Sequence, residues 1–190
     1  MSWFENIVEK ACRRAAKLAP AFRLITRGDN EPYLERYYYF RRDWTQAWFK
    51  NRGWQTPAML ARISSVCLHH FLKGDDEEEL HNHPCKKSYA LILTGGYHEE
   101  RRQGNGVVSR ILRPGSLNVI RDTDFHKVEL LDKKRGVWTL FITLDRNPDE
   151  RWGFWHPATG RYLDWKDHVS LRELRNNVVF VWPVSKTGEA

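Results

Sequence analysis

The chain has 190 residues and a formal net charge of +7, and its length suits one domain with a hydrophobic core. Hydrophobic residues make up 41% and charged residues 29% of the chain, which excludes a disordered protein. No run reaches the roughly 18 apolar residues that a membrane helix needs. Three cysteines form no paired framework, and residues 1–20 carry six charged side chains where a secretory signal is apolar. We therefore expect a cytoplasmic protein without membrane contact.

The basic excess, 31 basic against 24 acidic residues, is compatible with an anionic substrate, with nucleic acid or simply with solubility. The basic residues are scattered along the chain, and no zinc-finger spacing or other nucleic-acid-binding motif is present. We therefore do not expect nucleic acid as the partner, and the charge is weak support for a small anionic molecule.

Residues 1–20 predict a helix, because apolar residues recur at helical spacing after the capping-box pair Ser2 and Glu5, and Pro20 ends it. Short β-branched and aromatic runs then alternate with Gly, Pro and Asp turns. The predicted strands span residues 33–41, 60–72, 88–94, 107–112, 116–120, 126–131, 137–144 and 162–165. Close spacing without intervening helices predicts a mainly β, antiparallel barrel or sandwich. Ser170 and Glu173 indicate a short C-terminal helix, and residues 178–181 a last strand.

Two of the eight histidines, His81 and His83, stand one residue apart. On a strand, such residues project from one face about 6–7 Å apart, so both can bind one cation at about 2.0–2.2 Å. A neighbouring strand must supply a third ligand, and His126, which opens an apolar strand, is the best candidate. The adjacent His69 and His70 point to opposite faces, so at most one of them lines a cavity.

The segment from Leu80 to Gly95 resembles the first sequence motif of the cupin superfamily: an HxH pair, a spacer and a strand closed by glycine. The segment from Pro114 to His126 resembles the second motif. The layout is also similar to that of small cupin-like proteins of phages and bacteria, and the resemblance covers residues 29–166. It implies a cupin-type antiparallel β-barrel (a double-stranded β-helix) at 29–166, between a helix at 1–20 and a C-terminal helix, strand and tail at 167–190. It also implies a divalent transition metal, Fe(II) first and then Zn, Mn or Ni.

The family pattern places a glutamate ligand after HxH, and here the aligned residue is Ser88. One consequence is a three-histidine site, as in cupin thiol dioxygenases. Another is that Glu99 serves as an acid or ligand; parity places it on the face opposite Ser88 unless Gly95 and Gly96 form a bulge. Tyr97 is a further candidate for acid–base catalysis.

Two classes of function remain open. The first is a metal-dependent enzyme, an oxidoreductase or an isomerase or lyase, that acts on a small anionic molecule. The second is a non-catalytic module that senses a ligand or takes part in phage–host interaction. Three imidazoles bring no negative charge, so a bound cation would attract carboxylates, thiolates or phosphates. Trp-rich strands on the outer surface favour a homodimer.

Overall fold

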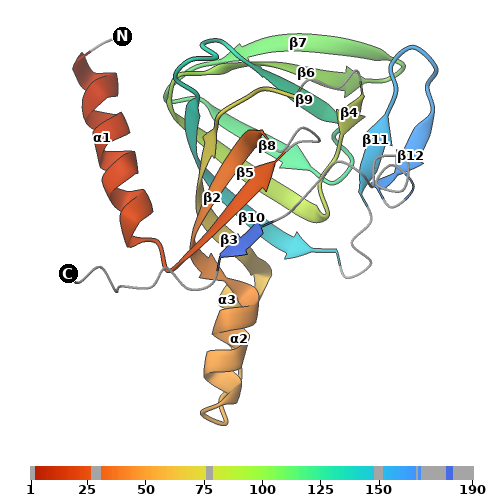
Figure 1. The fold of residues 1–190 in the computed structure, drawn as a ribbon. Coiled ribbons are helices and arrows are strands. Elements are labelled where there is room, and N and C mark those ends of the chain that lie inside the picture. The colour runs from red at the N-terminus through yellow and green to blue at the C-terminus, as the bar shows by residue number, and fades with distance from the viewer. Residues whose placement is uncertain are drawn as a thin grey trace.

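The computed structural model describes residues 3–26, 31–75, 79–147, 152–165 and 167, and the backbone of 179–181. Within these ranges the chain forms two antiparallel sheets, an N-terminal helix and two helices between β2 and β3 (Figure 1). The predicted mainly β, antiparallel class is confirmed. No described helix combines the length and the apolar character needed to span a bilayer.

The larger sheet has seven strands in the described residues, in the order β13-β1-β2-β3-β10-β5-β8, and every neighbouring pair is antiparallel. Its strands are β1 (Ala21–Thr26), β2 (Pro32–Arg41), β3 (Ile63–Phe71), β5 (Cys85–Thr94), β8 (Leu117–Arg121), β10 (Val137–Arg146) and β13 (Val179–Val181). Residues along β5 alternate between more and less buried, as a pleated strand with two different faces requires.

The smaller sheet has six strands in the described residues, in the order β12-β11-β4-β9-β6-β7. Its strands are β4 (Leu80–His81), β6 (Tyr97–Gln103), β7 (Gly106–Leu112), β9 (His126–Leu130), β11 (Gly153–Trp155) and β12 (Tyr162–Asp164). The chain passes from one sheet to the other between β5 and β6, at Gly95 and Gly96, whose φ angles are 73° and 146°. A Cβ atom on Gly96 would lie 2.6 Å from the carbonyl oxygen of Leu112, so only glycine fits this crossing.

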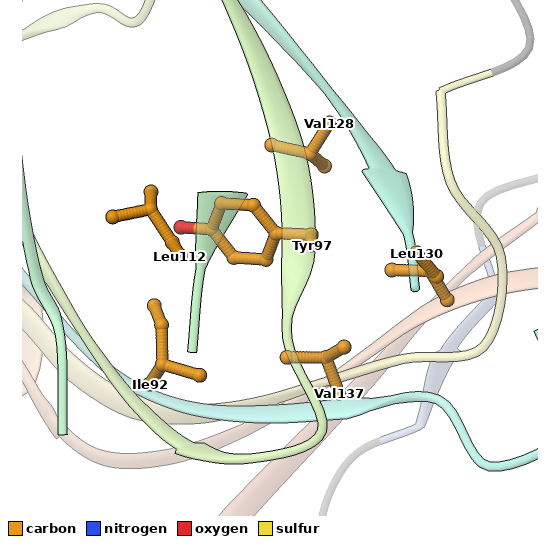
Figure 2. Packing of buried hydrophobic residues seen from close by; sticks show 6 residues of the cluster. All are labelled: Ile92, Tyr97, Leu112, Val128, Leu130 and Val137. Atoms are coloured by element: carbon orange, nitrogen blue, oxygen red, sulfur yellow. The ribbon is translucent and has the colours of Figure 1, made fainter. Parts of the chain in front are cut away.

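Side chains from both sheets meet in a hydrophobic cluster (Figure 2). The cluster comprises Ile92, Tyr97, Leu112, Val128, Leu130 and Val137. These residues come from β5, β6, β7, β9 and β10, and all are at most 7% exposed. Their burial holds the two sheets together at the end where the chain crosses between them.

Helix α1 (Trp3–Leu18) packs on the outer face of the larger sheet. Its Cys12 and Ala16 contact Leu68 and Trp138 of β3 and β10, and Arg135 is 2.7 Å from Glu9. The helix ends before Pro20, as predicted; Ser2, the predicted cap, lies outside the described residues. Apolar side chains of α1 therefore pack on apolar side chains of the larger sheet.

Helices α2 (Arg42–Lys50) and α3 (Ala58–Arg62) project from one end of the larger sheet (Figure 1). The sequence did not predict them. The predicted strand at 60–72 starts only at Ile63, because α3 takes up the residues before it. Strands β1, β4, β6 and β11 were also not predicted. The other predicted strands correspond to β2, β5, β7, β8, β9, β10, β12 and β13, while the predicted helix at Ser170 lies outside the described residues.

Candidate metal centre

The three predicted ligands lie together between the two sheets. His81 ends β4 and pairs in register with His126, the first residue of β9, while His83 follows two residues later along the chain. The ring centroids form a nearly equilateral triangle, with separations of 5.2 Å (His81–His83), 5.0 Å (His81–His126) and 5.1 Å (His83–His126). One nitrogen atom from each ring lies within 4.8 Å of the other two.

This nitrogen set fits a divalent transition metal. The Nε2 atoms of His83 and His126 are 2.8 Å apart, so a single ion at about 2.0–2.1 Å could touch both. Burial, followed by the nearby rings of His126 and His81, holds the pKa of His83 well below its usual range. The His83 imidazole is therefore neutral and has a lone pair to offer.

Asn82 fixes the segment that carries the two neighbouring histidines. Its side chain donates to the carbonyl oxygen of Asp122 over 2.5 Å and accepts from the backbone N–H of Gly153 over 2.7 Å. Asn82 is buried, and alternation along an extended segment turns His81 and His83 away from it. The asparagine thus ties the HxH segment to β11 and leaves both imidazoles facing the interior.

Glu99 lies behind His126. It is fully buried on β6, and its Oε1 atom is 2.8 Å from Nδ1 of His126. An ionised carboxylate only accepts hydrogen bonds, so Nδ1 carries the proton and Nε2 is left as the ligand atom. Glu99 therefore sets the tautomer and the orientation of the His126 ring.

Three further polar side chains surround the Glu99 carboxylate. Asn118 and Arg101 donate to Oε1 over 2.8 and 3.1 Å, and Arg110 donates to Oε2 over 2.6 Å. Burial alone would raise the pKa of Glu99, but the hydrogen bond and charge of His126, with Asn118 and Arg101, hold it well below its usual range. The Glu99 carboxylate is ionised, and both of its oxygens accept hydrogen bonds. A catalytic role for Glu99 remains a prediction.

Tyr97 belongs to the hydrophobic cluster of Figure 2. Its hydroxyl accepts a hydrogen bond from Asn118 over 3.1 Å, and burial raises its pKa to about 12. Neither Tyr97 nor Glu99 is among the described residues that line the cavity beside the histidines. The catalytic role predicted for Tyr97 also remains a prediction.

That cavity has a volume of about 500 Å³ and is bounded by His83. Ser88, the residue aligned with the family's glutamate, lies in its wall fully buried, and its Oγ has no hydrogen-bond partner among the described residues. His69 lies in the same wall with both ring nitrogens unpartnered in the described part of the chain. His70 points the other way, stacks on Trp138 and is 2.8 Å from Glu35. The expectation that at most one of the two histidines lines the cavity is confirmed.

The sequence named Glu99 as an acid or ligand but missed its place behind His126, and it missed Asn82, Arg101 and Asn118 altogether. Asn82 stands inside the HxH motif, and its small polar side chain between two histidines was the available signal. Glu99 and Arg101 alternate with period two along β6, but a strand with this many charges resembles an exposed segment. Asn118 carries no local signal, because its partners come from β6 and β7.

No protein-family model matches the sequence, and no curated protein matches it. Solved structures to which the chain is similar include Fe(II)-HppE with the alternative substrate (S)-1-HPP, at 12% identity and a TM-score of 0.44, covering 64% of this chain and 55% of that one. Hydroxypropylphosphonic acid epoxidase from S. wedmorenis matches at 11% identity and 0.44, with the same coverage. A cupin superfamily protein from Desulfitobacterium hafniense matches at 19% and 0.35, covering 44% of this chain and 68% of that one. This chain thus spans about half the length of the epoxidase structures. At these TM-scores the similarities carry no functional assignment.

Proposed function

We propose that this chain is a metal-dependent cupin-type protein that binds one divalent transition metal through His81, His83 and His126 and acts on a small anionic molecule. The observation that supports this most directly is the convergence of three imidazole nitrogens within 4.8 Å of one another, beside a cavity that His83 lines. We propose Fe(II) as the first candidate, followed by Zn, Mn or Ni. Held by three neutral imidazoles, such an ion keeps its full charge and supplies Lewis-acid or O₂ chemistry.

The residues of this chain have distinct tasks in that proposal. Asn82 holds two ligands at a fixed spacing, and Glu99 keeps Nε2 of His126 free of a proton. Ser88 leaves the position of a carboxylate ligand open, so that an anion can approach. His69 offers unpartnered ring nitrogens to a molecule in the cavity. The reaction class we propose is that of an oxidoreductase, isomerase or lyase.

The second candidate is a non-catalytic module that senses its ligand. One observation favours it: Asp43 is the only carboxylate among the described residues of the cavity wall, and Arg41 binds both of its oxygens over 3.1 and 2.7 Å. A general base of the usual carboxylate type is therefore missing from the described wall. Ligand binding without turnover in the metal-loaded protein, over a panel of small anions, would favour the sensor.

The test is the metal content of protein purified without a histidine tag. We expect about one divalent ion per wild-type chain, and a strong loss of the ion in the His81→Ala, His83→Ala double variant. His156→Ala is the control, because His156 lies outside the three-histidine group. Equal metal content in the wild type and the double variant would refute the proposal.

A further inference from the structure

The cavity beside His83 has a strongly cationic wall. Among the described residues that line it, five are arginines and Asp43 is the only carboxylate. The five are Arg23, Arg36, Arg41, Arg42 and Arg146, which come from β1, β2, α2 and β10. Residues far apart in the sequence thus bring positive charge to one cavity.

Arg23 and Arg36 lie directly opposite each other on the antiparallel strands β1 and β2. Side chains in such a pair start about 4.5–5.5 Å apart, and like charges there destabilise a sheet. Burial and then the charge of Arg36 lower the pKa of Arg23. A negatively charged ligand bound between the two guanidinium groups would offset their repulsion.

The same sheet face continues the polar lining toward the metal centre. Arg36 pairs in register with His69. Four positions further along β3, beyond the apolar Cys67 and Phe141, the register joins Ser65, Thr143 and Ser88. The interior face of a covered sheet is normally apolar, yet here His69 and Ser88 lack hydrogen-bond partners in the described residues. Buried polar groups without partners indicate that a polar ligand completes them.

At the end of the sheet, α2 adds a second set of cationic groups. Arg42, the first residue of α2, bonds the hydroxyl of Ser64, and the backbone N–H of Arg146 donates to the same oxygen over 3.0 Å. Arg41 is bound to Asp43, so one of the five arginines already has an anionic partner. Within the described wall, the single carboxylate of Asp43 does not balance the charge of the five arginines.

We propose that this cavity binds a phosphorylated small molecule, a phosphate monoester or a phosphonate, whose dianionic group is held by Arg23 and Arg36 and whose remainder extends toward His83. Guanidinium groups present paired N–H donors that match tetrahedral oxyanions. The volume of about 500 Å³ exceeds that of a phosphate ion and leaves space for an organic part. This inference names the substrate class of the function proposed above. It rests on that function only in placing the organic part of the ligand beside the metal centre.

The test compares four probes by calorimetry and thermal shift: inorganic phosphate, glycerol 3-phosphate, lactate and glycerol. We expect the two phosphorylated probes to bind and to raise the melting temperature, with lactate much weaker and glycerol silent. Arg36→Gln and the Arg23→Gln, Arg36→Gln double variant should weaken phosphate binding by about tenfold or more. Arg113→Gln is the control, because Arg113 is exposed and outside the described cavity wall.

A second readout separates ligand binding from a structural role. Without ligand, Arg36→Gln should melt at or above the wild-type temperature, because one member of a like-charge pair is gone; a structural arginine would give the opposite shift. Metal content is measured in the same samples. Arg23→Gln, Arg36→Gln protein should keep its metal, and His81→Ala protein should keep phosphate binding, so either proposal can fail alone.

Three outcomes would overturn the inference. The first is that no phosphorylated probe binds, and the second is that all variants bind equally well. The third is that lactate binds as tightly as glycerol 3-phosphate. Single-stranded DNA that binds with the same dependence on Arg36 would assign the wall to a nucleic acid and overturn it as well.

Discussion

Nδ1 of His126 and Oε1 of Glu99 are 2.8 Å apart, and the carboxylate is fully buried between the two sheets. One contact thus joins a candidate metal ligand to a network of Arg101, Arg110 and Asn118. Since these partners come from three strands, the position of the ligand depends on packing between segments distant in the chain.

Glu99→Gln should weaken metal binding while leaving all three imidazoles in place. A glutamine that accepts from Nδ1 has lost the charge that raises the basicity of Nε2, and changes of this kind typically cost about 10- to 100-fold in affinity. Competitive titration with a chelator measures the loss. Glu100→Gln is the control, because Glu100 pairs with Lys127 instead. Unchanged affinity in Glu99→Gln would contradict the role of Glu99 in positioning His126.

The stability of the protein should depend on pH through Glu99. Because the pKa of this carboxyl is lowered in the fold, its ionised form contributes stability above the usual pKa of 4.5, and this is lost as the pH falls toward the folded value. The difference in unfolding free energy between wild type and Glu99→Gln should be largest near neutral pH and shrink below pH 4.5. Denaturant titrations at several pH values measure it, and a difference that grows in acid would have the wrong sign.

Ser88→Glu should close the open anion position at the metal. In cobalt-substituted wild type, small carboxylates and thiols should shift the visible spectrum, because three imidazoles leave the cation its full charge. The variant supplies its own carboxylate from the cavity wall and should lose that response, whereas Ser88→Ala should keep it. A response in Ser88→Glu as strong as in wild type would show that position 88 does not reach the metal.

Asn82→Ala should lower stability and metal affinity together. The change leaves the N–H of Gly153 and the carbonyl of Asp122 without their partner, at a cost of about 1–3 kcal/mol for each buried group. The HxH segment keeps its backbone pairing with β11 but loses the side-chain ties to Gly153 and Asp122, so the spacing of the two imidazoles is held less firmly. Thermal unfolding and metal titration of the same sample check both effects. A stable variant with wild-type affinity would show that the tie is dispensable.

The sequence predicted that His81, His83 and His126 lie together, because HxH spacing puts two imidazoles on one side of an extended segment and His126 opens an apolar strand. The expectation that both members of the pair lie on a strand is wrong, since β4 ends at His81. The sequence also predicted most strands of the larger sheet, since β5 and β10 are apolar and β-branched. Strand β6 was not predicted because its run of charged residues is typical of an exposed segment, whereas in the fold Glu99 is fully buried and pairs with the partly buried Arg101. The arginine-lined wall of the cavity was not predicted, because Arg23 and Arg36 become neighbours only through the pairing of β1 with β2.

The pairing of β13 with β1 has a practical consequence. Residues 179–181 cover the outer edge of β1, the strand that carries Arg23. A truncation that removes them would turn β1 into an edge strand with a row of open N–H and C=O groups, which invites pairing with another chain. Shortened versions made for crystallisation should therefore self-associate more readily than the full chain, even though every ligand of the metal centre is retained.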